Sequence, residues 1–129
     1  MQTKYTPANI VRALRLPFLA ASCFPFIFGS LIEREGFNFT GFFLGLVAVA
    51  AAHLSANLIN DYFDSRSMAD WQDRRFFGFF GGSKLIQEGV FTENFYLKAS
   101  LLSAVVSFIA LLILAFILNN FLVLIVFCV

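Results

Sequence analysis

The fold is decided by the stretch FFLGLVAVAAAHLSANLI, which covers residues 42–59 and contains no Asp, Glu, Lys or Arg. A helix of this length rises by roughly 27 Å, so it nearly crosses the ~30 Å hydrocarbon core of a bilayer. Two apolar stretches of similar length lie on either side of it, at 16–32 and 99–118. The sequence therefore predicts an all-α, polytopic transmembrane helix bundle with three full spans.

A fourth apolar stretch begins at Phe121 and continues to Val129. A helix over these residues would be roughly 13 Å long, which is too short to cross the bilayer core. We therefore expect a truncated fourth span at 121–129. The alternative is an apolar tail that lies in the membrane interface.

The composition excludes several classes of protein. The chain is 60% hydrophobic and 13% charged, which rules out a water-soluble globule and a disordered chain. The net charge is +1, so the chain has no basic excess for binding nucleic acid. Basic residues are frequent before 16–32 and after 42–59, but Arg34 stands alone between them. The positive-inside rule then predicts that the N-terminus and the 60–98 loop are cytoplasmic.

A polar stripe runs along the end of the second predicted span. His53, Asn57, Asn60, Asp61 and Asp64 follow the spacing i, i+4, i+7, i+8 and i+11, which places all five on one face of a helix. Polar groups at membrane depth are costly unless they face a protein interior or a watery cavity. The stripe is therefore a candidate site, although His53 alone is more simply explained by an interhelical hydrogen bond.

The carboxylates of this stripe indicate a hard cation. Asp61 and Asp64 are three residues apart and would repel each other unless a cation lay between them. Carboxylate and amide oxygens without thiolates favour Mg²⁺, which commonly joins carboxylates to substrate phosphates. The alternative is a solvated acidic helix end that pairs with nearby arginines, namely Arg66, Arg74 and Arg75.

A glycine-rich segment follows, GGSKLIQEG at 81–89. Flexible backbone N–H groups and the ammonium of Lys84 could hold a phosphate, although a plain turn explains this segment more simply when it is taken by itself. Together with the acidic helix end, the segment predicts a diphosphate site at the cytoplasmic membrane surface. The 19 Phe residues of this apolar chain favour a lipid diphosphate.

At these residues the chain resembles the UbiA superfamily of intramembrane prenyltransferases. The similarity rests on Asn-Asp-Tyr-Phe-Asp at 60–64 followed by Asp70, and on GGSKLIQEGVFT at 81–92. The spacing N-x3-D-x5-D is similar to that of the menaquinone-pathway branch, which prenylates 1,4-dihydroxy-2-naphthoate. That branch commonly has Gly where this chain has Met68.

The resemblance implies a Mg²⁺-dependent enzyme of the bacterial inner membrane that transfers a prenyl group from a prenyl diphosphate to an aromatic acceptor. Dihydroxynaphthoate is the acceptor that the spacing favours over hydroxybenzoate, homogentisate, haem or a lipid alcohol. The implied catalytic and metal-binding residues are Asp61, Asp64 and Asp70. The implied ligands of the diphosphate are Asn57, Asn60 and Lys84.

The family has a second aspartate-rich motif in its C-terminal half, whereas residues 99–129 contain no Asp or Glu. We therefore expect residues 1–129 to be the N-terminal part of a single prenyltransferase domain that is inactive alone. A fragment, a truncated gene product and one piece of a split enzyme all fit, the last needing a partner that carries the second motif. The alternative is a non-catalytic membrane protein or remnant of that fold, which acts as a helix-bundle partner.

Overall fold

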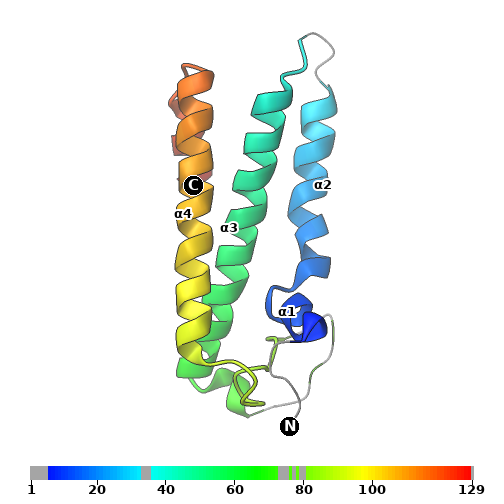
Figure 1. Ribbon diagram of the computed structural model, residues 1–129, viewed down its shortest axis with the longest axis vertical. Helices are drawn as coiled ribbons and strands as arrows, with labels where there is room; N and C mark the ends of the chain where they lie inside the picture. Colours follow the sequence, from blue (N-terminus) through cyan, green and yellow to red (C-terminus); the bar gives the residue numbers. More distant parts are fainter. Residues whose placement is uncertain (1–5, 33–35, 73–75, 77, 79–80, 129) are drawn as a thin grey trace.

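The computed structural model describes residues 6–32, 36–72, 76, 78 and 81–128, and every regular element within these ranges is a helix (Figure 1). The elements are, in chain order, α1 (Pro7–Ala13), α2 (Leu16–Ile32), α3 (Phe39–Arg66), the 3-10 helix η1 (Ala69–Trp71), α4 (Glu93–Ile117) and α5 (Leu122–Cys128). The predicted all-α class is therefore confirmed for the described part of the chain.

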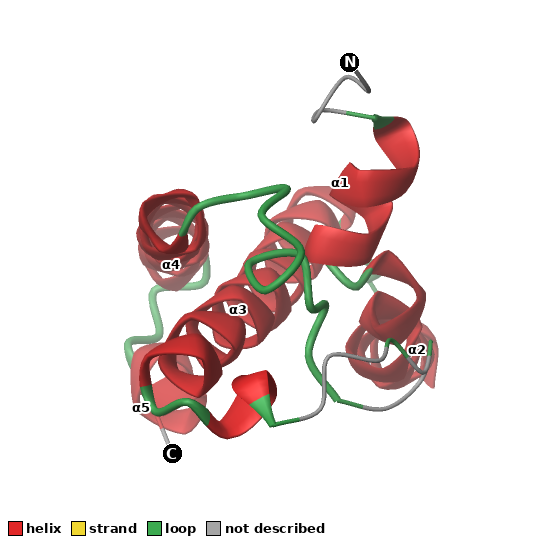
Figure 2. Cartoon of the chain, turned by 90° about the horizontal axis from the view of Figure 1, so that it is seen from below, coloured by secondary structure: helices red, strands yellow, loops and turns green. Residues whose placement is uncertain are grey.

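Helices α2, α3 and α4 lie side by side with α3 in the middle (Figure 1, Figure 2). Small residues let α3 and α4 approach closely: Ala48 of α3 is buried, and the Ser107 hydroxyl of α4 donates a 2.8 Å hydrogen bond to its carbonyl. The Ser100 hydroxyl likewise donates to the Ser55 carbonyl at 3.0 Å. Small residues and hydrogen bonds of this kind are typical of helix packing inside membranes.

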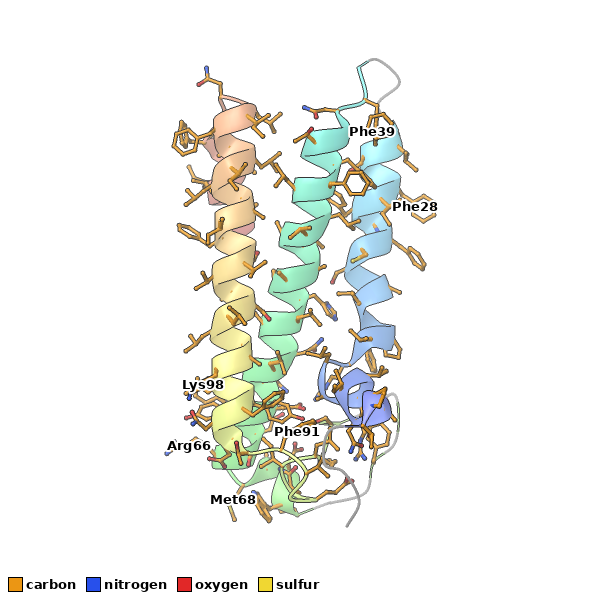
Figure 3. All side chains as sticks on the ribbon, in the orientation of Figure 1. Phe28, Phe39, Arg66, Met68, Phe91 and Lys98 are labelled. Atoms are coloured by element: carbon orange, nitrogen blue, oxygen red, sulfur yellow. The ribbon has the colours of Figure 1, made fainter. Side chains whose placement is uncertain are left out.

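Two helices, α3 and α4, are each long and apolar enough to cross a membrane. Helices α1 and α2 together would make a third span, bent by 53° at the break between them. The break contains Arg15, whose backbone is left-handed with φ 48°. Phe28 points outward from α2 and is 67% exposed, as expected of a side chain that faces lipid (Figure 3). These features fit association with a membrane.

Helix α5 has seven residues and turns back beside α3 and α4. Its Val123 and Leu124 pack against a buried cluster of Ala48, Ala110 and Leu111. The last apolar stretch thus contains a short helix that packs against α3 and α4.

The helices extend beyond two of the apolar stretches, so the predicted 60–98 loop is too long. Helix α3 continues past residue 59 to Arg66, and α4 begins at Glu93, which leaves 67–92 as the connection. Thr92 caps α4 by accepting a hydrogen bond from the Phe95 N–H at 3.2 Å. A hydropathy pattern detects only the apolar part of a helix, which can lie in the hydrocarbon core. The polar turns beyond it remain helical because their backbone N–H and C=O groups still form hydrogen bonds within the helix.

The connection is held against the helix ends by a small apolar core. This core consists of Ala13 from α1, Leu58 from α3, Leu85 and Phe91 from the connection, and Tyr96 from α4. Leu58, Leu85 and Tyr96 have no exposed surface. The glycine-rich segment is therefore fixed beside the last turns of α3.

Candidate functional site

Three carboxylates converge where α3 ends. Asp61 and Asp64 lie on the last two turns of α3, and Asp70 lies on η1. Each offers an oxygen within 4.8 Å of the oxygens offered by the other two. The three residues assigned to the acidic motif from the sequence are thus brought together.

Met68 makes the turn that returns Asp70 to the end of α3. Its backbone is left-handed, with φ 66° and ψ 6°. This conformation costs an L-residue roughly 1–2 kcal/mol but costs Gly little. Met68 thus takes a conformation that favours Gly, and Asp70 still reaches the cluster.

Met68→Gly is therefore expected to stabilise the protein by about 1 kcal/mol, because it removes the backbone strain. Thermal unfolding in detergent micelles, followed by circular dichroism, measures the change. The matched control is Ser67→Gly, since Ser67 has an ordinary φ of −75°. A loss of stability in Met68→Gly as large as that in Ser67→Gly would refute the assignment of strain to Met68.

Two cations already partner the carboxylates. Arg15 forms an ion pair with Asp61 through Nη2 and Oδ1. The Lys84 ammonium lies 2.5 Å from Asp70 Oδ1, and both side chains are buried. Asp64 instead accepts a 2.7 Å hydrogen bond from the Asn60 amide. The three negative charges thus face two positive ones, which leaves the cluster attractive to a further cation.

The glycine-rich segment lies directly on the carboxylates. A Cβ at Gly82 would overlap Asp70 Oδ2 and lie 3.3 Å from Asp61 Oδ1, so glycine is required for this approach. The next backbone N–H, that of Ser83, donates to Asp61 Oδ2 at 3.0 Å. Gly81 and Lys84 both have left-handed φ angles, of 72° and 60°. Residues 81–84 therefore form a tight strap over the acidic cluster.

Helix α4 holds this strap in place. Tyr96, in its second turn, places its hydroxyl 2.5 Å from the Ser83 hydroxyl, and both side chains are buried. Ser83 belongs to the glycine-rich segment that the sequence predicts to hold a phosphate, whereas no motif marks Tyr96. Arg15 was assigned no site role either, although it lies in the arginine-rich segment before the first apolar stretch.

The remaining residues of the polar stripe lie further from the carboxylates along α3. Asn57 is half-buried, and its Nδ2 has no hydrogen-bond partner among the described groups. His53 lies one turn further, and its Nδ1 is 2.8 Å from the Ser22 hydroxyl of α2. The interhelical hydrogen bond expected for His53 is therefore confirmed.

The alternative interpretation, in which the acidic helix end pairs with three arginines, is not what the structure shows for Arg66. Its guanidinium donates a 3.0 Å hydrogen bond to the Tyr62 hydroxyl and lies over the Tyr62 ring. Four residues separate the two along α3, which places them on one face and turns Arg66 away from the carboxylates. Arg74 and Arg75 lie outside the described residues.

A cavity of about 350 Å³ lies beside the strap, between α1 and the start of α2. Its lining includes Val11, Arg12, Arg15, Phe18, Phe76 and Ser83. The Arg12 guanidinium is held by Glu88 at 2.6 and 3.0 Å and lies 3.9 Å from the centre of the Phe76 ring. Arg15 therefore separates an apolar cavity from the carboxylate cluster.

The donor atoms of the cluster fit Mg²⁺. All three are carboxylate oxygens, the hard ligands that Mg²⁺ prefers, and no thiol or imidazole is among them. Two oxygens on one Mg²⁺ lie at most about 4.2 Å apart, so the cluster would contract slightly around the ion. The absence of a Cβ at Gly82 leaves room for the Asp70 carboxylate at this place.

Comparisons of the chain with models of known protein families, with curated proteins and with solved structures give no match.

Proposed function

We propose that the chain is the N-terminal part of a UbiA-like intramembrane prenyltransferase. The reaction would be the Mg²⁺-dependent transfer of a prenyl group from a prenyl diphosphate to an aromatic acceptor such as 1,4-dihydroxy-2-naphthoate. The observation that carries the proposal is the meeting of three carboxylates, a buried lysine and a glycine strap at the end of an apolar helix. This set of groups suits a diphosphate bound through a divalent cation.

The residues have separate roles in this proposal. Asp61, Asp64 and Asp70 would hold Mg²⁺, which supplies positive charge to the departing diphosphate. Lys84 would bind the diphosphate oxygens as a compact cation. The amides of Asn57 and Asn60 would donate hydrogen bonds to the same group, and the unpartnered Nδ2 of Asn57 supports this role.

The bond changes follow from these positions. The carbon–oxygen bond of the prenyl diphosphate would break, and its electrons would stay on the diphosphate, where Lys84 would stabilise them. An electron-rich ring carbon of the acceptor would then bond to the allylic carbon, and that ring carbon would lose its proton to water or to the released diphosphate. The cavity beside Arg15 would take the acceptor, because aromatic and basic side chains line it together.

The topology in this proposal has three full spans and the beginning of a fourth. The first is the bent pair α1–α2, the next two are α3 and α4, and α5 begins the fourth. The N-terminus and the 67–92 connection would lie on the cytoplasmic side of a bacterial inner membrane. The carboxylates would then lie at the mouth of the bundle, where a diphosphate can stay in water while its prenyl tail enters the apolar region.

A second acidic cluster completes the site in this proposal, because one cluster holds a Mg²⁺–diphosphate only in part. Residues 99–129 supply no Asp or Glu. We propose that further helices carrying these acids belong to the active enzyme, in the same polypeptide or in a partner.

Residues 1–129, purified in detergent, are therefore expected to give no prenyl transfer to an aromatic acceptor. The assay follows a radiolabelled prenyl diphosphate into the acceptor, with Mg²⁺ present. Clear turnover that Asp64→Ala abolishes would show that one cluster suffices.

A non-catalytic role as a helix-bundle partner is the second candidate. It is favoured by the ion pairs of Asp61 with Arg15 and of Asp70 with Lys84, which partner two of the carboxylates without a metal. Binding of Mg²⁺ and a prenyl diphosphate distinguishes the two functions, because a merely structural ion-pair network has no need of either.

A further inference from the structure

In the proposed function the Asp70 carboxylate must be free to bind Mg²⁺, but in the structure the Lys84 ammonium is bonded to it. The ammonium is 2.5 Å from Asp70 Oδ1, and Lys84 is only 7% exposed. Its backbone has a φ of 60°, a conformation that is costly for an L-residue. The buried Lys84 ammonium therefore neutralises part of the negative charge of the acidic cluster.

The proposed function requires both partners of this ion pair for other tasks. Asp70 would bind Mg²⁺, and Lys84 would bind the diphosphate. A divalent cation on Asp70 would lie within a few ångströms of the ammonium and repel it strongly in a buried setting. The ion pair seen here and the loaded site therefore compete for the Asp70 carboxylate.

We propose that Lys84 and the divalent cation exchange at Asp70. Without ligand, Lys84 closes the strap of residues 81–84 over the carboxylates. When Mg²⁺ and the diphosphate bind together, the cation takes the Asp70 oxygen and Lys84 moves to the diphosphate. This inference rests on the proposed function, and it adds a device that couples the binding of the two ligands.

The exchange makes a specific thermodynamic prediction. When Mg²⁺ binds alone, it must displace the Lys84 ammonium from Asp70, and the ammonium then has no anion to pair with. Mg²⁺ alone should therefore bind weakly. Mg²⁺ with diphosphate supplies that partner, so the two ligands bind with positive cooperativity. Coupling between two ligands is commonly worth 5–150-fold in affinity.

Trp71 provides a local signal for this test. It is the single tryptophan of the chain and directly follows Asp70, and its indole N–H donates to the Ser65 carbonyl at 3.2 Å. Its fluorescence is measured in detergent micelles, first with MgCl₂ alone and then with MgCl₂ and geranyl diphosphate. The chain is compared as wild type and as Lys84→Met, which keeps the length of the side chain and removes its charge.

Lys84→Met is expected to tighten the binding of Mg²⁺ alone about tenfold and to weaken the binding of Mg²⁺–geranyl diphosphate about tenfold. Lys98→Met is the control, since Lys98 is exposed on α4, and it should change neither affinity. Mg²⁺ binding that is the same in wild type and Lys84→Met would overturn the exchange alone. No response in either protein to MgCl₂, whether alone or together with geranyl diphosphate, would overturn the proposed function as well.

A second measurement needs no variant. Buried in its ion pair, Lys84 should react slowly with an acetylating reagent, whereas the exposed Lys98 should react fast. Saturating Mg²⁺ without diphosphate should raise the acetylation rate of Lys84 relative to Lys98 several-fold, as measured by mass spectrometry. A ratio that Mg²⁺ leaves unchanged would contradict the exchange.

Discussion

Asp61→Ala is expected to lower the free energy of unfolding by about 3–5 kcal/mol, the usual cost of removing one partner of a buried ion pair. Asp61 is 3% exposed and binds groups from two other segments, the Arg15 guanidinium and the Ser83 N–H. Alanine would leave the guanidinium uncompensated and the N–H unbonded. Denaturant unfolding in mixed micelles, followed by circular dichroism, measures the loss.

The matched control is Asp64→Ala. Asp64 is half-buried and is bonded to the Asn60 amide of its own helix. Its removal should cost less than about 1 kcal/mol, because no buried charge loses its partner. Equal losses in the two variants would show that Asp61 does not hold α1, α3 and the strap together.

Gly82→Ala is expected to weaken Mg²⁺ binding at least tenfold and to cost about 1–3 kcal/mol of stability. The added Cβ would overlap Asp70 Oδ2, and the Asp70 side chain is short and fixed by Lys84, so the carboxylate or the strap must move. Trp71 fluorescence reports the binding and thermal unfolding reports the stability.

Gly29→Ala is the control for this substitution. Gly29 lies inside α2 with open space where its Cβ would be, so alanine there should leave both quantities unchanged or slightly raise the stability. A Gly82→Ala protein that behaves like Gly29→Ala would refute the close approach of the strap to the carboxylates.

The sequence predicts the helices better than it predicts their ends. The first apolar stretch coincides with α2 because both its ends are marked by charged residues, at Arg15 and after Ile32. The second stretch stops at Ile59, seven residues before the helix does, because Asp61 and Asp64 are polar but still helical. A hydropathy pattern detects helix turns that contact lipid. The last turns of α3 contact the strap instead, so their polar residues do not fit that pattern.

The sequence predicts the part of the candidate site whose residues lie close together along the chain. Helical periodicity places Asp61 and Asp64 on one face, and the turn at Met68 adds Asp70 from six residues further on. Arg15 is 46 residues from Asp61, and Tyr96 is 13 residues from Ser83. These contacts depend on the bend between α1 and α2 and on the packing of α4 against α3, which no short motif encodes.

The cations that pair with the acidic cluster differ from those that the sequence indicated. From the sequence, Lys84 is a ligand of the diphosphate and the nearby arginines are possible partners of the acids. In the structure, Lys84 and Arg15 are the cations that hold the cluster, and the ring of Tyr62 holds Arg66. Arg15 reaches Asp61 through the bend between α1 and α2, and Lys84 reaches Asp70 through the turn of residues 81–84, so composition alone could not decide which cation pairs with which acid.

The proposed function depends on the binding of a prenyl diphosphate to the three carboxylates through Mg²⁺. Its most direct test is isothermal titration of the purified chain in detergent micelles with geranyl diphosphate, with and without Mg²⁺, for the wild type and for Asp64→Asn. We expect weak, saturable binding that requires Mg²⁺ and is at least tenfold weaker in Asp64→Asn, while the thermal midpoint stays that of the wild type. Binding that is equal without Mg²⁺, or that Asp64→Asn leaves unchanged, would contradict it.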